Sequence, residues 1–154
     1  MDTDPSSPLI VDLVILGACF ALSFFFSAAE TALISANTLR LQHMAEGGNR
    51  AAKKLLELKA DTAGLLATLL LGNNVANILS AAVSTAVAIR LYGEDYGVVI
   101  ATATTTLIVL IFCEVLPKSL AAASPEKASI SLLLPVLVAR AILGPAAWLL
   151  QVLT

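Results

Sequence analysis

One carboxylate lies deep within a long apolar segment. Within residues 98–116 the only charged residue is Glu114, and Pro117 follows three residues later. An ionisable side chain at such a depth costs ~3 kcal/mol or more and commonly marks an ion or proton pathway. In a helix, Pro117 leaves the carbonyl of Cys113 without its amide partner. Carboxylate and carbonyl oxygens are hard ligands of the type that Mg²⁺ and Ca²⁺ select. The alternative is that Glu114 lies at the membrane interface, pairs with Lys118 and precedes an ordinary helix end.

A second apolar segment, at residues 9–36, carries polar residues on one side. Ser23, Ser27 and Glu30 fall at i, i+4 and i+7, so in a helix they share a face. Such a stripe is poorly matched to lipid, so we expect it to face protein or water.

A third apolar segment, at residues 62–90, repeats polar residues at helical spacing. For Ser80 and Ser84 we favour interhelical hydrogen bonds, which contribute only ~0.6 kcal/mol on average in membranes. Gly72 and Asn73 favour a different interpretation, because glycine permits close backbone approach and carboxamides and carbonyls offer oxygens. Asn77 lies one turn further along the same face.

The composition excludes several classes of protein. The chain has 154 residues, 58% hydrophobic and 13% charged, with a mean hydropathy of +0.91, so we predict a membrane protein. The net charge of -2 and the lack of basic patches with aromatics predict no nucleic-acid partner. The sole histidine, His43, lies in the charged loop without a nucleophile, so we predict that the protein is not an enzyme.

The order of segments predicts an all-α membrane protein with three transmembrane helices, at about 9–36, 62–90 and 98–116. Residues 37–61 contain five Lys or Arg and are expected to form two short amphipathic helices at the cytoplasmic surface, broken at Gly47–Asn49. Residues 92–97 form an extracytoplasmic turn. The apolar stretch at about 126–154, interrupted by Pro135, Arg140 and Gly144–Pro145, is expected to lie bent along or partly in the membrane. This order predicts an N-terminus outside and a C-terminus in the cytoplasm.

The ends of the chain carry two further expectations. The acidic start lacks a basic region, so the first apolar segment is expected to be a membrane span and not a signal peptide. The apolar end, Gln151–Thr154, is expected to be a cut within a longer protein.

Three separated motifs resemble the CorC/CNNM family of magnesium transporters, and more narrowly the transmembrane (DUF21) domain of a bacterial CorC. They are Phe26–Leu33, Leu71–Asn77 and Glu114–Lys118. The resemblance implies a single domain at 1–154 with three transmembrane helices, cytoplasmic juxtamembrane helices and a belt-like helix after the third span. It implies a homodimer in the inner (plasma) membrane, continuing into a CBS-pair domain that binds ATP and a CorC/HlyC domain, both absent from this chain. It also implies Mg²⁺ export from the cytoplasm by alternating access, coupled to inward movement of Na⁺.

The resemblance also carries site residues. It implies metal ligands at Ser23, Ser27, Gly72, Asn73, Asn77 and Glu114, with Glu30, Pro117 and Lys118 at the entrance or gate. Helix breaks near Gly72 and Pro117 would place backbone oxygens around the ion. The alternative is a non-transporting membrane anchor or sensing module that dimerises through polar and small-residue helix faces.

Overall fold

The structure is a computed structural model that describes the backbone of residues 6–153 and the side chains of residues 9–149. The described residues form helices and no strand, which confirms the all-α prediction. In chain order the elements are α1 (Ser6–Ser35), α2 (Thr38–Glu46), α3 (Arg50–Ala60), α4 (Thr62–Tyr92), α5 (Glu94–Ile108), η1 (Val109–Val115), α6 (Leu116–Ala123) and α7 (Pro125–Leu153). Residues 1–5 and 154, which the predicted domain and belt helix include, lie outside the described residues.

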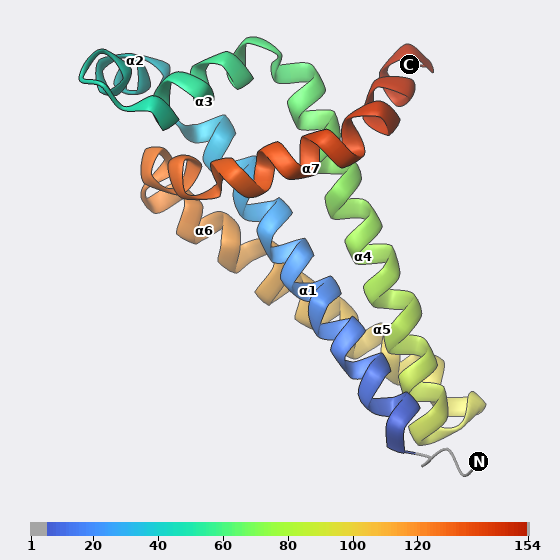
Figure 1. Ribbon diagram of the computed structural model, residues 1–154. Helices are drawn as coiled ribbons and strands as arrows, with labels where there is room; N and C mark the ends of the chain where they lie inside the picture. The colour runs from blue at the N-terminus through green and yellow to red at the C-terminus, as the bar shows by residue number, and fades with distance from the viewer. Residues whose placement is uncertain (1–5, 154) are drawn as a thin grey trace.

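Three helical runs form a bundle, and α7 lies across it. α1, α4 and the continuous run α5–η1–α6 extend along one another, whereas α7 crosses α1 and α4 (Figure 1). Among the described residues, four runs are long and apolar enough to span a bilayer, and the fourth is Pro125–Leu149 in α7. The crossing orientation of α7 agrees with three spans followed by a belt-like helix.

The charged loop forms the two short helices predicted from its sequence. Each helix begins at an asparagine that caps free backbone amides: the side chain of Asn37 accepts from Leu39 and Arg40, and that of Asn49 accepts from Ala52. We call this end of the bundle, where α2 and α3 lie, the juxtamembrane end. A core of buried leucine and alanine side chains from α1, α2, α3, α4 and α7 holds these elements together there.

The second span is uninterrupted, so the predicted break at Gly72 is wrong. α4 remains helical from Thr62 to Tyr92, and Gly72 lies inside it. The glycine instead allows close packing, because a Cβ at this position would lie 2.4 Å from the ring of Phe26 on α1. α4 ends at Gly93, whose φ of 80° favours glycine, and α5 begins at the next residue. The turn is therefore shorter than the predicted range 92–97. We call the end of the bundle where α4 and α5 meet the hairpin end.

The third span continues past the point where we expected it to stop. Helical structure runs from Glu94 to Ala123, so the predicted end at Pro117 is wrong. Residues Val109–Val115 adopt wider π-helical turns, in which the amide of Leu116 bonds to the carbonyl of Ile111. Proline cannot donate an amide hydrogen bond, and the wider turns immediately before Pro117 accommodate it without ending the helix.

Candidate functional site

The centre of the candidate site is a buried hydroxyl between two carboxamides. Ser23 Oγ on α1 lies 2.6 Å from Asn77 Oδ1 and 3.2 Å from Asn73 Oδ1, both on α4. Ser23 is 0% exposed and Asn73 is 8% exposed. A serine hydroxyl carries one proton, so it cannot fully satisfy both oxygens at once. The Ser23 proton therefore serves only one of the two carboxamide oxygens at a time, while both oxygens stay within 3.2 Å of the hydroxyl.

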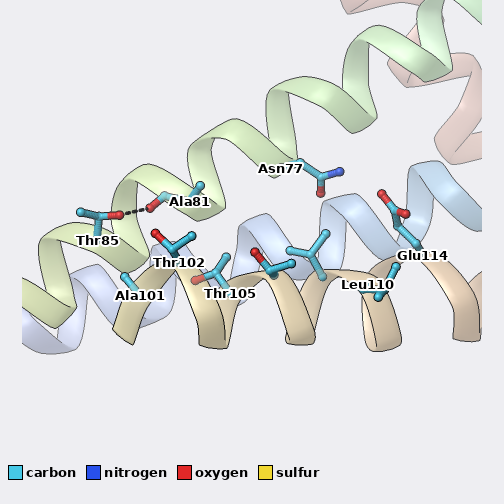
Figure 2. A pocket seen from close by; sticks show the side chains of 10 residues that line it. Asn77, Ala81, Thr85, Ala101, Thr102, Thr105, Leu110 and Glu114 are labelled. Atoms are coloured by element: carbon cyan, nitrogen blue, oxygen red, sulfur yellow. Dashed lines mark hydrogen bonds between the residues drawn. The ribbon is translucent and has the colours of Figure 1, made fainter. Parts of the chain in front are cut away.

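The third span contributes two groups of Glu114, its main-chain carbonyl and its side-chain carboxylate. Ser27, which is fully buried on α1, lies with its Oγ 3.5 Å from the main-chain carbonyl of Glu114 in η1. The Glu114 carboxylate lines a cavity of 360 Å³ between α4 and the α5–η1 run, together with Asn77. Figure 2 shows the Asn77 and Glu114 side chains extending into this space from facing helices. Predicted site residues from three separate spans therefore lie next to one another.

The chemistry of this set is that of neutral oxygen donors with one carboxylate. The described residues contain no cluster of three or more His, Cys, Asp or Glu side chains that could hold a metal ion. Hydroxyl, carboxamide, carbonyl and carboxylate oxygens suit hard cations. Metals that prefer thiolate or histidine ligands are poorly matched to this set. The residues present therefore match the ligand preferences of a hard cation.

Gly72 and Pro117 occupy packing positions beside this cluster. Both residues are buried. Gly72 lies on α4 against the Phe26 ring, and its helix is continuous, so the expectation of carbonyls freed by a break there is not met. Pro117 lies two residues after the end of η1, and the wider turns of η1 carry Glu114.

Glu30 and Lys118 face each other closer to the juxtamembrane end. Lys118 Nζ lies 4.0 Å from a Glu30 carboxylate oxygen, and both side chains are partly exposed. Within the described chain the ion pair of Lys118 is thus with Glu30, and the alternative pairing of Glu114 with Lys118 is wrong. This pair joins α1 to α6 about one helical turn from Ser27 and Glu114.

Sequence reasoning missed the threonines that line the cavity beyond Glu114. Thr102, Thr105 and Thr106 on α5 and Thr85 on α4 contribute to its wall. Thr102 donates to the Val98 carbonyl of the preceding turn, an ordinary bond for a threonine in an apolar helix. Their i, i+3 and i+4 spacing was the available signal for a shared face.

The two serines further along α4 differ from each other. Thr105 Oγ1 donates to Ser84 Oγ across the helix interface, as the predicted interhelical bonding requires. Ser80 instead donates to the Ala76 carbonyl of its own helix at 2.8 Å, so the interhelical prediction is wrong for that residue. A hydroxyl in an apolar environment can satisfy its proton on the preceding turn without any neighbouring helix.

Ion pairs and a lysine hold the bundle at both ends. At the hairpin end, Arg90 on α4 lies 3.0 Å from Asp12 on α1. At the juxtamembrane end, Lys59 Nζ donates to the carbonyls of Leu33 at 2.9 Å and Ala36 at 2.6 Å, where a cation stabilises the end of α1. Burial lowers the pKa of Lys59, and the nearby Glu126 carboxylate opposes that shift.

Comparisons with known proteins point to one family. Residues 14–154 match the family described as "Cyclin M transmembrane N-terminal domain". The chain is 45% identical over 136 residues to the UPF0053 inner membrane protein YfjD of Escherichia coli, covering 86% of this chain and 31% of that protein. It is 41% identical over 156 residues to a UPF0053 protein of Haemophilus influenzae, covering 100% of this chain and 36% of that protein. It is 32% identical over 140 residues to a chloroplastic DUF21 domain-containing protein of Arabidopsis thaliana, covering 91% and 20%. The chain thus spans about a third of the length of the two bacterial relatives.

Proposed function

The chain belongs to the Cyclin M (CorC/CNNM) family as its transmembrane domain, and from this premise we propose that it binds Mg²⁺ within the membrane and exports it from the cytoplasm. It is a multi-pass membrane domain, with apolar helical runs long enough to cross a bilayer. The proposal concerns the ion, the direction of transport and the residues that hold it.

One observation carries the proposal: oxygen atoms from two helices converge at Ser23, beside the Glu114 carboxylate. Two carboxamide oxygens, of Asn73 and Asn77, approach a hydroxyl that has a single proton, in a largely buried environment. A cation bound there would be coordinated by the hydroxyl and carboxamide oxygens, with the Glu114 carboxylate supplying a negative charge.

A single carboxylate suits transport better than storage. A transporter must bind its ion strongly enough to capture it and weakly enough to release it. Mg²⁺ gives up its waters reluctantly and usually keeps several of them. Hydroxyl and amide oxygens around one carboxylate therefore favour a modest affinity and exchange between water and protein ligands.

The remaining parts of the mechanism follow the family. Glu30, beside Lys118 and nearer the juxtamembrane end, would attract cations at a cytoplasmic entrance. The five Lys or Arg of residues 37–61 support a cytoplasmic position for this end, and hence an N-terminus outside. Alternating access, coupling to inward Na⁺ movement, a homodimer and location in the inner (plasma) membrane are part of the proposal. Binding of ATP would occur only through a CBS-pair domain outside this chain.

Transport and binding are tested together by Glu114→Gln, which keeps the shape of the side chain and removes its charge. We expect Mg²⁺ affinity, measured as Mg²⁺-dependent protection against thermal unfolding, to fall by at least ~100-fold, because the substitution removes a negative charge at short range from the ion. Flux of Mg²⁺ through the protein reconstituted in liposomes should fall with it. Glu94→Gln is the matched control, since Glu94 lies in the first turn of α5, away from the cluster.

Two outcomes would contradict the proposal. Unchanged Mg²⁺ protection and flux in Glu114→Gln would remove this carboxylate from the site. A folded wild-type protein that moves no Mg²⁺ would favour the alternative of a non-transporting anchor or sensing module.

A further inference from the structure

The cavity at Glu114 extends far beyond the predicted ligands. From Ala101 to Glu114 its wall follows α5 and η1, a rise of about 20 Å at ~1.5 Å per residue. That distance is about two thirds of a ~30 Å hydrocarbon core. The cavity therefore extends from the depth of the candidate site at Glu114 toward the hairpin end, as far as Ala101.

Its polar lining has no basic group, and two of its threonine hydroxyls present only acceptors. Thr102 donates its hydroxyl proton to the Val98 carbonyl at 2.8 Å, and Thr85 donates to the Ala81 carbonyl at 2.8 Å. The direction of both bonds is fixed because a carbonyl can only accept. Each hydroxyl oxygen therefore keeps only lone pairs for other contacts. Figure 2 shows Thr85, Thr102 and Thr105 along the facing helices, with Glu114 at one end. No lysine or arginine is among the described residues of this lining.

The volume of the cavity fits an ion that travels with water. A space of 360 Å³ holds about 12 water molecules at ~30 Å³ each, enough for a cation with its octahedral shell. Oxygen acceptors favour the protons of the waters that surround a cation and disfavour anions. The apolar residues between the threonines offer no ligand that would hold the ion permanently.

We propose that this cavity, lined by Thr85, Thr102, Thr105 and Thr106, is the hairpin-end half of the ion pathway, through which a hydrated divalent cation leaves the Glu114 site. The inference rests on the proposed transport function and extends it to residues outside the predicted ligand set. Contacts between the threonine oxygens and the waters of the ion are transient, so these residues influence the rate of passage and leave binding at the Ser23 cluster unchanged.

The fold offers a matched control on the same helix. Thr104 bonds back to the Ile100 carbonyl at 2.7 Å, like Thr102, but it is not part of the cavity wall. Back-bonding threonines are common in apolar helices for reasons unrelated to transport. Thr104 represents that ordinary case, and valine replaces threonine at either position with nearly the same shape.

The first experiment compares Mg²⁺ flux through reconstituted protein carrying Thr85→Val with Thr102→Val, or Thr104→Val alone. We expect the double variant to reduce flux severalfold at saturating Mg²⁺, with an unchanged midpoint of Mg²⁺-dependent thermal protection. Thr104→Val should transport like wild type. Equal flux in all three proteins, or an equal reduction in both variants, would overturn the pathway.

The second experiment asks directly whether the cavity contains water. In a background carrying Cys19→Ala and Cys113→Ala, Thr102→Cys should react with a membrane-impermeant thiol reagent added at the hairpin side, and Thr104→Cys should not. Failure to label position 102 would overturn the inference even if wild-type protein transports Mg²⁺. If wild-type protein moves no Mg²⁺, the transport function itself fails, and labelling at 102 would then show a water-filled cavity that is not an ion pathway.

Discussion

Ser23→Ala tests whether the central hydroxyl organises the site or merely fills space. The substitution removes the donor that lies 2.6 Å from Asn77 Oδ1 and 3.2 Å from Asn73 Oδ1. A buried acceptor left without its donor costs about 1–3 kcal/mol in soluble proteins. Side-chain hydrogen bonds between membrane helices average only ~0.6 kcal/mol, with a maximum near 1.7. Because this hydroxyl serves two carboxamides, we expect a loss of about 1–2 kcal/mol in the free energy of unfolding without Mg²⁺.

Ser80→Ala is the matched control for this prediction. Ser80 is also fully buried, and the same oxygen atom is removed. Its hydroxyl bonds only to the Ala76 carbonyl, which as a helical carbonyl keeps its main-chain partner. The expected loss is therefore below about 0.5 kcal/mol, at the low end for a net hydrogen bond.

The assay is thermal or denaturant unfolding in detergent, followed without Mg²⁺ and across a Mg²⁺ titration. A ligand at 100 times its dissociation constant stabilises the folded state by ~2.7 kcal/mol. Ser80→Ala should keep this increment, and Ser23→Ala should lose much of it at the same Mg²⁺ concentration. Equal stabilities of the two variants, together with equal Mg²⁺ increments, would refute the assignment of Ser23 to the site.

Two further predictions concern the surroundings of the site. Gly72→Ala places a Cβ 2.4 Å from the Phe26 ring, so we expect the free energy of unfolding to fall by about 1–3 kcal/mol, measured by thermal unfolding. A second change, Phe26→Leu, should relieve this loss. Additive effects of the two substitutions would contradict the contact. At the start of α7, backbone amides of Glu126 and Asn37 hold the pKa of the Glu126 carboxyl below its usual range. Its contribution to stability is thus present above the ordinary carboxyl pKa and lost as pH falls through the lowered value. Amide exchange at Asn37, corrected for intrinsic rate, should accelerate on acidification in wild type and change little in Glu126→Gln.

Local patterns in the sequence predicted most of the fold. Apolar length predicted the spans, and the charged loop with its break at Gly47–Asn49 predicted the two short helices α2 and α3. The belt position of α7 followed from its interruptions at Pro135 and Pro145, although neither proline ends the helix. These features depend on neighbours in the chain and need no knowledge of tertiary contacts.

The errors arose where tertiary packing decides the outcome. A glycine beside two asparagines was consistent with a helix break, but Gly72 serves the close packing of Phe26, a residue 46 positions earlier in the chain. Proline after an acidic residue was consistent with a helix end, but π-helical turns accommodate Pro117 within a continuous run. The partner of Lys118 could likewise not be predicted from the sequence, because Glu30 lies far from Lys118 along the chain and meets it only in the folded bundle.

The π-helical turns give Glu114 two separate roles at the same position. Its main-chain carbonyl faces the Ser27 hydroxyl on α1, and its carboxylate lines the cavity between α4 and α5. Widened turns displace carbonyls from the regular α-helical pattern, and such turns are frequent at functional sites. The residue thereby joins the buried polar cluster on one side to the threonine-lined cavity on the other. An ion that exchanged ligands around Glu114 would pass between them without leaving the Glu114 carboxylate.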